Sequence, residues 1–128
     1  MTVFYRTKIT EVGPEVPELI EGGILILYAE GAPPELAEVS VLHRVEEGPT
    51  ADTPPVGARL RIGEVSVQLT AVGELAWKKV ADIGHVVINF DRAATAGRPG
   101  ELCASKTEAE ALIRALVAGA EITITSAA

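Results

Sequence analysis

The sequence predicts an all-β fold, a small barrel or sandwich of short antiparallel strands with one or two short helices, in a single domain over residues 1–128. Short apolar segments recur along the 128-residue chain, and Gly- and Pro-containing turns separate them. Apolar residues make up 48% of the chain and aromatic residues only 4%, which favours a core of Val, Ile, Leu and Ala. The strand–helix alternation of a dinucleotide-binding fold is absent from the pattern.

Turn residues divide the first half of the chain into three predicted strands. Residues 2–12 alternate with period two, so Val3, Tyr5 and Thr7 face one side. The elements predicted after this strand are an acidic connection over 17–23, a strand covered on both faces over 23–28, a short turn or helical piece over 35–38, and a strand over 39–46.

The second half begins with a Pro-rich surface loop over 48–55. Gly63 and Glu64 then separate two apolar segments, 58–62 and 65–72, by the two-residue spacing of a tight hairpin. The remaining predicted elements are an amphipathic helix over 74–82 ended by Gly84, strands over 85–90 and 101–104, a three-turn helix opened by a Thr107/Glu110 capping box and ending before Gly119, and a strand over 121–125.

Charge and composition exclude several classes of partner. Eighteen acidic and eleven basic residues leave a formal charge of −7, the wrong sign for a nucleic-acid binder. The longest apolar run, 24–29, falls far short of the roughly 20 residues of a membrane span, and no signal-peptide pattern is present. The one cysteine, Cys103, is interpreted as a small core residue, and its isolation fits a reducing, cytoplasmic location.

The two histidines are the candidate chemical residues, because the motifs of nucleotide hydrolysis, hydride transfer, zinc proteolysis and serine hydrolysis are absent. His43 shares a strand face with Val41 and Val45. Two interpretations follow: a buried histidine bonded to a carbonyl, or a nucleophilic imidazole at the rim of a flat apolar docking surface. Arg44 faces the other way on an ideal strand, and a bulge is needed to turn it toward a phosphate.

His85 opens a strand directly after a helix end. The structural interpretation is that its imidazole satisfies a carbonyl at that helix end. The alternative is that His85 and His43 converge in space. A metal site would then need a third ligand such as Asp91 or Glu101, and no spacing in the chain specifies one.

The chain resembles the glucitol/sorbitol-specific enzyme IIA components of the bacterial phosphoenolpyruvate-dependent sugar phosphotransferase system (PTS). The similarity runs nearly end to end, and its most specific part is a Thr-Ala-Val-Gly segment followed at a fixed separation by Gly-His-Val. The residues that carry it are Met1-Thr2-Val3, Glu30-Gly31-Ala32-Pro33, the apolar pair before His43, Thr70-Ala71-Val72-Gly73, Gly84-His85-Val86, Phe90-Asp91 and Gly119.

The resemblance implies a barrel-like β fold and a phosphohistidine intermediate, with His43 at the position of the family's phosphorylated histidine. It implies that the phosphoryl group comes from the phosphocarrier HPr and passes to a cysteine of the IIB component, which works with the IIC membrane component. No cofactor and no metal are expected. On sequence position, Arg44 is a candidate for stabilising the phosphoryl group and His85 for orienting His43.

Two other classes of function stay open at this stage. One is a non-catalytic regulatory or protein-binding module that keeps the fold and His43. The other, less favoured, is a barrel that binds a metal or small ligand through His43 and His85. A homodimer formed through exposed strand edges is a further option.

Overall fold

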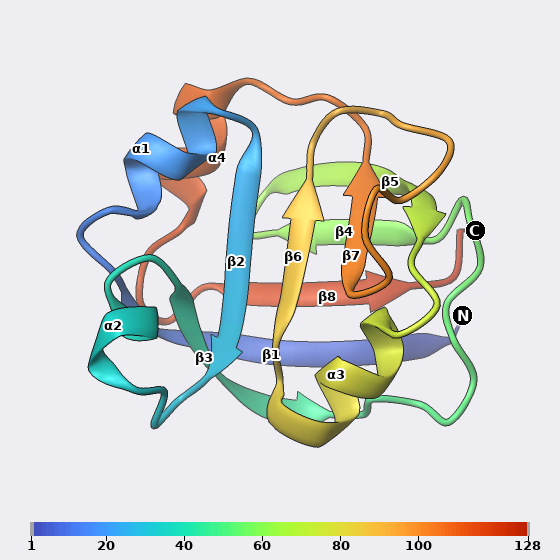
Figure 1. Cartoon of the computed structure of the whole chain (residues 1–128), viewed down its shortest axis with the longest axis horizontal. Helices are drawn as coiled ribbons and strands as arrows, with labels where there is room; N and C mark the ends of the chain where they lie inside the picture. Colours follow the sequence, from blue (N-terminus) through green and yellow to red (C-terminus); the bar gives the residue numbers. More distant parts are fainter. Residues whose placement is uncertain (1, 128) are drawn as a thin grey trace.

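The computed structural model describes residues 2–127, in which eight strands close into one barrel and four short helices pack around it (Figure 1). Around the barrel the strands follow the order β1-β3-β2-β6-β7-β5-β4-β8. The strands are β1 (Val3–Val12), β2 (Ile24–Ala29), β3 (Val41–Glu47), β4 (Arg59–Ile62), β5 (Val65–Val72), β6 (Val86–Asn89), β7 (Glu101–Ala104) and β8 (Glu121–Thr125), and the helices are α1 (Val16–Glu21), α2 (Pro34–Ala37), α3 (Ala76–Ile83) and α4 (Ala109–Ala115).

The strand pattern predicted from the sequence is largely confirmed. Alternation along β1 buries Tyr5, Thr7 and Ile9 on the interior face. The hairpin forms between β4 and β5, with Gly63 in the left-handed conformation (φ 56°) that its turn position requires. β7 and β8 begin and end at the predicted residues.

The all-β prediction holds, with two differences in the arrangement of strands. Two neighbouring pairs, β2–β3 and β6–β7, run parallel, whereas every other pair is antiparallel. A parallel pair needs a crossover instead of a hairpin, and the segment with α2 supplies the one from β2 to β3. The closed order leaves no unpaired strand edge in residues 2–127, so the edge pairing considered for a homodimer has no template.

The helices differ more from the prediction. Most of the predicted acidic connection over 17–23 is helical and belongs to α1. Pro17 is compatible with this helix because it lies in the first turn, where a missing N–H costs no helical hydrogen bond. Val16 and Ile20 bury one face of that helix, which packs against α4. α4 itself begins only at Ala109 and has no side-chain cap, so the predicted capping box does not form.

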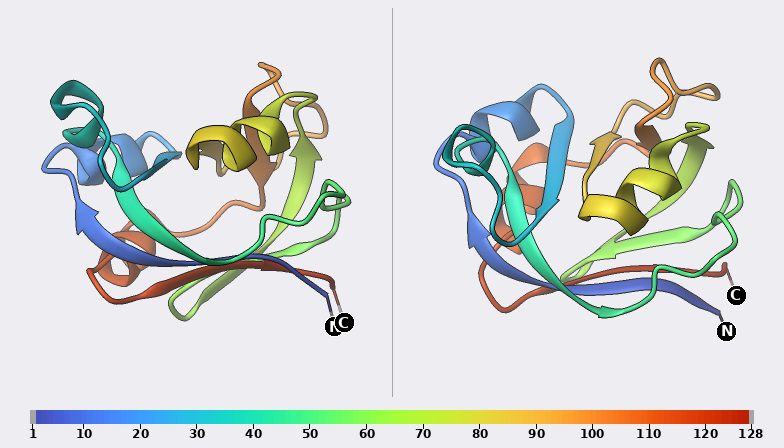
Figure 2. Two further views of the ribbon diagram at one scale, coloured as in Figure 1. Left: turned by 90° about the horizontal axis from the view of Figure 1, so that it is seen from below. Right: turned by 60° about the horizontal axis from the view of Figure 1, so that its bottom comes forward.

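The core is one mainly aliphatic cluster, with Tyr5, Trp77 and Phe90 among its members, that fills the barrel and the space beneath the helices. β2 buries Leu25 and Leu27 and leaves its other face partly exposed, so the prediction of a strand covered on both faces is wrong. Cys103 is 1% exposed, as expected of a core residue. The ends of the chain lie side by side, joined by the Thr2 amide donating to Ser126 Oγ at 2.9 Å (Figures 1 and 2).

Helix α3 is the element that closes the barrel over the candidate site. Figure 2 shows it facing the long strands β1 and β8 across the interior. Trp77 of α3 packs edge-on against Tyr5 of β1, with ring centroids 6.0 Å apart, and its Nε1–H donates to the Thr50 carbonyl at 2.7 Å. Gly84 ends the helix in the left-handed conformation (φ 61°), as predicted from its position.

Candidate functional site

His43 lies on β3 and is only 1% exposed, with its ring inside the barrel. The prediction of a flat apolar surface around His43 is wrong. Val41 is fully buried, and of the two valines only Val45, at 39% exposed, reaches the surface. The β1–β3 pairing is interrupted by two register shifts, and the strand from Arg44 to Glu47 is exposed throughout. His43 is therefore an interior residue and not part of a docking rim.

Both ring nitrogens of His43 have hydrogen-bond partners. Nε2 lies 2.8 Å from the carbonyl oxygen of Gly84, the residue that ends α3. Nδ1 lies 2.6 Å from Thr7 Oγ1 on β1, and Tyr5 Oη is more distant at 3.5 Å. A carbonyl oxygen only accepts, so Nε2 is the donor in the contact with Gly84. The ring is thereby held between β1 and the α3–β6 junction.

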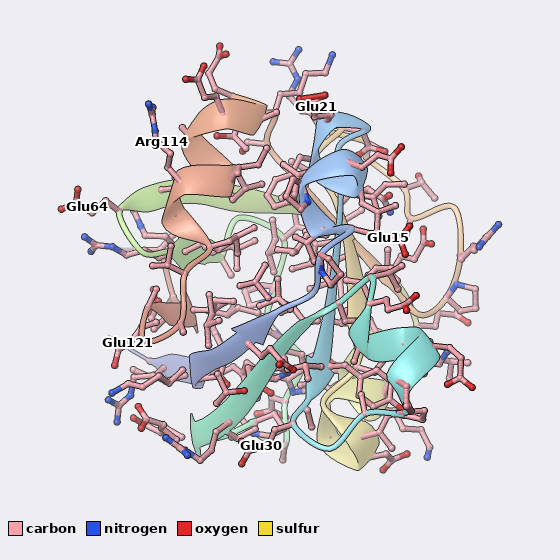
Figure 3. The ribbon with its side chains drawn as sticks, turned by 90° about the vertical axis from the view of Figure 1, so that its left-hand side faces the viewer. Glu15, Glu21, Glu30, Glu64, Arg114 and Glu121 are labelled. Atoms are coloured by element: carbon pink, nitrogen blue, oxygen red, sulfur yellow. The ribbon has the colours of Figure 1, made fainter. Side chains whose placement is uncertain are left out.

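Burial keeps the imidazole of His43 uncharged at neutral pH. Burial lowers the pKa of His43 below its ordinary value of 6.5, because the charged form loses its hydration. The hydrogen bond to Gly84 and the negative charge of Glu30 act in the opposite direction and are smaller. Glu30 is exposed and is labelled with other surface carboxylates in Figure 3. A neutral ring has one nitrogen with a free lone pair, which is the form that acts as a nucleophile.

His85 lies on the other side of the same sheet. It is half-buried on the outer face of β2 and β6, where its Nδ1–H donates to the Leu27 carbonyl at 3.1 Å. Its ring lies against Tyr28, with centroids 5.0 Å apart. The prediction that His85 satisfies a helix-end carbonyl is wrong, because His43 binds the carbonyl of Gly84 at that helix end. The two histidines are linked only through the backbone, since His85 follows Gly84 directly.

The structure does not bring the Arg44 side chain to the His43 ring. Arg44 is exposed, and within residues 2–127 its guanidinium has no hydrogen bond or ion pair. Its backbone carbonyl is the part that reaches the site, accepting a hydrogen bond from Thr7 Oγ1 at 2.7 Å. The phosphoryl-stabilising role expected for its side chain stays a prediction.

Sequence reasoning missed Thr7, whose hydroxyl oxygen lies 2.6 Å from Nδ1 of His43. The signal was present: Thr7 shares the buried face of β1 with Tyr5 and Ile9, and a polar residue on an apolar strand face is the same anomaly that drew attention to His43. Gly84 was identified as a helix end, but its carbonyl became a functional group only through tertiary contact.

The residues considered as a third metal ligand serve other contacts. Glu101 Oε1 accepts a hydrogen bond from Asn89 Nδ2 at 2.9 Å, and Asp91 Oδ1 accepts one from the Ala93 amide at 3.0 Å. Across residues 2–127, His, Cys, Asp and Glu side chains form no group of three or more with the geometry to hold a metal ion.

Comparison with known families gives a match over residues 4–123 to the model of the PTS system glucitol/sorbitol-specific IIA component. The chain belongs to this family. Two curated relatives, each named PTS system glucitol/sorbitol-specific EIIA component, come from Shigella flexneri and Escherichia coli strain K12. Each is 35% identical over 100 residues, covering 78% of this chain and 80% of the relative. The resemblance drawn from the sequence is thus confirmed.

The fold of this IIA family member is also found in a crystal structure of a PTS system IIA component from Enterococcus faecalis V583. The two structures superpose with a TM-score of 0.72 at 19% identity, covering 94% of this chain and 98% of the other. At that identity the likeness establishes a shared fold. Among residues 2–127 no helix is both long and apolar enough to cross a membrane.

Proposed function

We propose that this IIA family member relays a phosphoryl group in a glucitol/sorbitol-type sugar uptake system, with His43 as the residue that carries it. The phosphoryl group arrives from phospho-HPr and leaves for a cysteine of the IIB component. The observation that carries the proposal is the state of His43: an imidazole inside the barrel, bonded at both nitrogens and kept neutral by burial.

The chemistry is two displacements at phosphorus. In the first, a lone pair on His43 forms a P–N bond while the bond from phosphorus to the donor group of phospho-HPr breaks, and its electron pair returns to that donor group. In the second, the IIB cysteine thiolate forms a P–S bond while the P–N bond to His43 breaks, and its electron pair returns to the His43 ring. Positioning of the imidazole supplies most of the catalysis, because little other covalent chemistry is required.

The burial of His43 adds a requirement to this relay. At 1% exposure the ring is closed to a protein donor in the conformation described above. Transfer therefore includes an opening step that uncovers the ring. In-line displacement needs the nucleophile within contact distance of phosphorus, so the opening precedes transfer in each direction.

The partners and location follow from the same proposal. HPr and the IIB and IIC components are the partners, and the relay operates in the cytoplasm, where phospho-HPr is available. The acidic side chains labelled in Figure 3, Glu15, Glu21, Glu30, Glu64 and Glu121, are exposed and spread over the surface. A partner with a basic rim suits this surface, and its association weakens as salt screens the charges.

The test is phosphorylation in a reconstituted system. The purified chain is incubated with labelled phosphoenolpyruvate, enzyme I and the cognate HPr, and acid-labile protein phosphate is measured. We expect label on the wild type and on His85→Ala, and none on His43→Ala. Thermal unfolding of His43→Ala checks that it is folded. An unlabelled wild type, with an HPr that labels another IIA component in the same mixture, contradicts the proposal.

A second function, a regulatory module that binds protein without carrying phosphate, is favoured by one observation. Two hydrogen bonds and 1% exposure are also what a purely structural histidine shows. The two functions differ in the labelling experiment, since a regulatory module binds its partner equally well with and without phosphoenolpyruvate and takes up no label.

A further inference from the structure

The outer face of β1, β8 and β4 carries a concentration of positive charge that the relay does not use. Arg6 on β1 and Arg61 on β4 are both register partners of Thr123 on β8, so the three residues form one row across the strands. Alternation turns Arg6 outward, because its neighbours on either side along β1 are buried. Arg59 lies two residues before Arg61 and therefore on the same outer face.

The three arginines border a groove with a volume of about 430 Å³, which we call the arginine groove. Its polar lining is Arg6, Arg59, Arg61, Glu121, Thr123 and Thr125. Three arginines and one glutamate give the groove a formal charge of +2, in a chain whose formal charge is −7. Figure 2 shows α3 facing β1 and β8 across the interior, so the groove lies on the opposite side of this wall from α3 and from the buried His43.

Two of these arginines have no carboxylate partner. Within residues 2–127, neither Arg59 nor Arg61 takes part in an ion pair. A guanidinium N–H of Arg59 donates to Ser66 Oγ at 3.1 Å. The Nε–H of Arg61 donates to the Gly63 carbonyl at 3.1 Å. Because a guanidinium group has five N–H donors, one such bond steadies each side chain and leaves other donors to bind a ligand.

The third arginine is held by weak contacts. Arg6 lies 3.3 Å from Glu47 and 3.5 Å from Glu121, in ion pairs whose side chains are all about half-exposed. Ion pairs at this exposure contribute little to stability, because water solvates both charges when they separate. Figure 3 shows Glu121 at the surface of the molecule. Arg6 is therefore able to leave Glu121 for a more highly charged anion in the groove.

A phosphate monoester is the anion that fits this arrangement. Its charge of about −1.5 to −2 at pH 7 matches the two arginines without carboxylate partners, whereas a single carboxylate neutralises only one. Planar guanidinium groups bind phosphate oxygens through pairs of parallel hydrogen bonds. The Thr123 and Thr125 hydroxyls also line the groove and can donate to the same oxygens. The groove is larger than one phosphate group, so an organic part has room beside it.

We propose that the arginine groove binds a small phosphate monoester, with Arg59 and Arg61 holding the phosphate group and Arg6 at its edge. The groove lies on the other side of the barrel wall from His43, so the inference does not depend on the proposed relay. An acidic protein segment is the alternative occupant. The hollow shape of the groove favours the smaller ligand, because hollows of this size are typical of small-molecule sites.

The first test is a titration of the purified, unphosphorylated chain with glucitol 6-phosphate and with glycerol 3-phosphate. 1H–15N spectra report the backbone amides and the arginine Nε–H groups, and calorimetry gives the Kd. We expect saturable binding that shifts the Nε–H signals of Arg59 and Arg61 and the amide signal of Thr123. Glucitol, which has no phosphate group, should cause no shift. Absence of saturable binding with both esters, or shifts confined to another surface, overturns the inference. HPr is not in the mixture, so this result is independent of the labelling test.

Inorganic phosphate separates an ester site from a site for the free ion. We expect its Kd to be at least about threefold above that of glucitol 6-phosphate, because only the ester has an organic part that contacts the groove. Equal Kd values would assign the groove to the phosphate ion alone and overturn the inference.

Variants test the role of the guanidinium groups. In Arg61→Gln we expect the Kd for glucitol 6-phosphate to rise about tenfold, the effect of one lost charge-assisted hydrogen bond. Arg61→Lys keeps the charge but not the planar fork, and its Kd should rise about threefold. Arg114→Gln is the matched control, because it removes the same charge from an exposed position on α4, and its Kd should stay within about twofold of wild type. Thermal unfolding checks that each variant is folded. Equal Kd values in Arg61→Gln and Arg114→Gln would show a general attraction to positive charge and overturn the site.

The pH dependence and an acidic peptide separate phosphate from carboxylate ligands. The second proton of a phosphate monoester binds near pH 6, while arginine keeps its charge. We expect the affinity for glucitol 6-phosphate to fall about threefold between about pH 7.5 and about pH 5.5. A hexaglutamate peptide that binds in the groove more tightly than glucitol 6-phosphate would assign the groove to an acidic protein segment, and it would overturn the inference.

Discussion

The two histidines lie on either side of one backbone segment and have opposite environments. His43 is inside the barrel, 1% exposed, with partners at both nitrogens. His85 is half-buried on the outer face, where one ring nitrogen bonds to the Leu27 carbonyl and the ring lies against Tyr28. The carbonyl that holds His43 belongs to Gly84, the residue before His85. The inner histidine is oriented by this segment, and the outer histidine anchors it.

This difference teaches that residue type alone does not assign chemistry. In the sequence the two residues are alike, since both are histidines and each lies on a strand or next to one. The interior environment desolvates His43 and fixes its proton on one nitrogen. At the outer face a single hydrogen bond to the neighbouring strand ties His85 to β2.

The largest expected contrast is in chemical accessibility. Diethyl pyrocarbonate modifies neutral imidazole, so in the native protein we expect His43 to react on the order of a hundredfold more slowly than His85, as for a site that opens at a cost of about 3 kcal/mol. Mass spectrometry of peptides at increasing reaction times measures both rates. In urea-unfolded protein the two rates should converge, and native rates within a factor of about two would contradict the buried position of His43.

The segment between the histidines is tested by Gly84→Ala. Gly84 has a φ of 61°, and a Cβ there would lie 2.8 Å from Ala29 Cβ, so backbone strain and a steric clash combine. We expect a loss of about 2 to 3 kcal/mol in the free energy of unfolding, measured by urea denaturation. Gly31→Ala is the matched control: its φ is 93° with no atom within 4 Å of the added Cβ, and it should lose only about 1 kcal/mol. Equal losses in both variants would argue against close packing at Gly84.

The buried state of His43 also predicts a dependence of stability on pH. The folded-state pKa of His43 lies below 6.5, its ordinary value in the unfolded chain. As pH falls below about 6.5, the unfolded state binds a proton that the folded state excludes, so this contribution to stability decreases until the folded pKa is reached. We expect His43→Gln to show a smaller loss of unfolding free energy than wild type between about pH 8 and about pH 5. An identical pH profile in the two proteins would exclude a lowered pKa.

The smallest expected effect concerns His85. In His85→Ala the hydrogen bond to Leu27 is lost, and the Gly84 carbonyl loses part of its anchoring. We expect phosphate uptake by His43 to slow about threefold, within the range of one modest hydrogen bond. Initial rates with phospho-HPr measure this, with Arg44→Ala alongside it to test the side chain of Arg44. An unchanged rate in His85→Ala would remove its orienting role.

Much of the fold was predictable from local pattern. Period-two alternation placed Tyr5 and Thr7 on one face of β1, and the two-residue gap at Gly63 predicted the β4–β5 hairpin. The errors have physical causes. Pro17 was taken as a loop residue although the first turn of a helix tolerates it, and the parallel pairing of β2 with β3 depends on a crossover that leaves no local signal.

At the candidate site the sequence identified His43 as anomalous and left two positions open for it, a buried histidine bonded to a carbonyl and the rim of a docking surface. The structure confirms the first position, with Nε2 bonded to the Gly84 carbonyl. Alternation gives the face on which a side chain lies, and it does not say whether that face lines an interior or a docking surface. Val41 and Val45 share the predicted face, yet Val41 is fully buried and Val45 is exposed. Thr7, like His43, is a polar residue on an apolar strand face, so the sequence pattern alone could have identified it as a candidate site residue.

The sequence by itself determined the class of fold, the family and the residue with unusual chemistry, because these depend on periodicity, turn residues and motif spacing along the chain. Only the tertiary structure decided the state of that residue. Thr7, His43 and Gly84 come from β1, β3 and the end of α3, and their hydrogen bonds exist only once the barrel has closed. Proton position and desolvation are properties of that closed interior, so no local pattern encodes them.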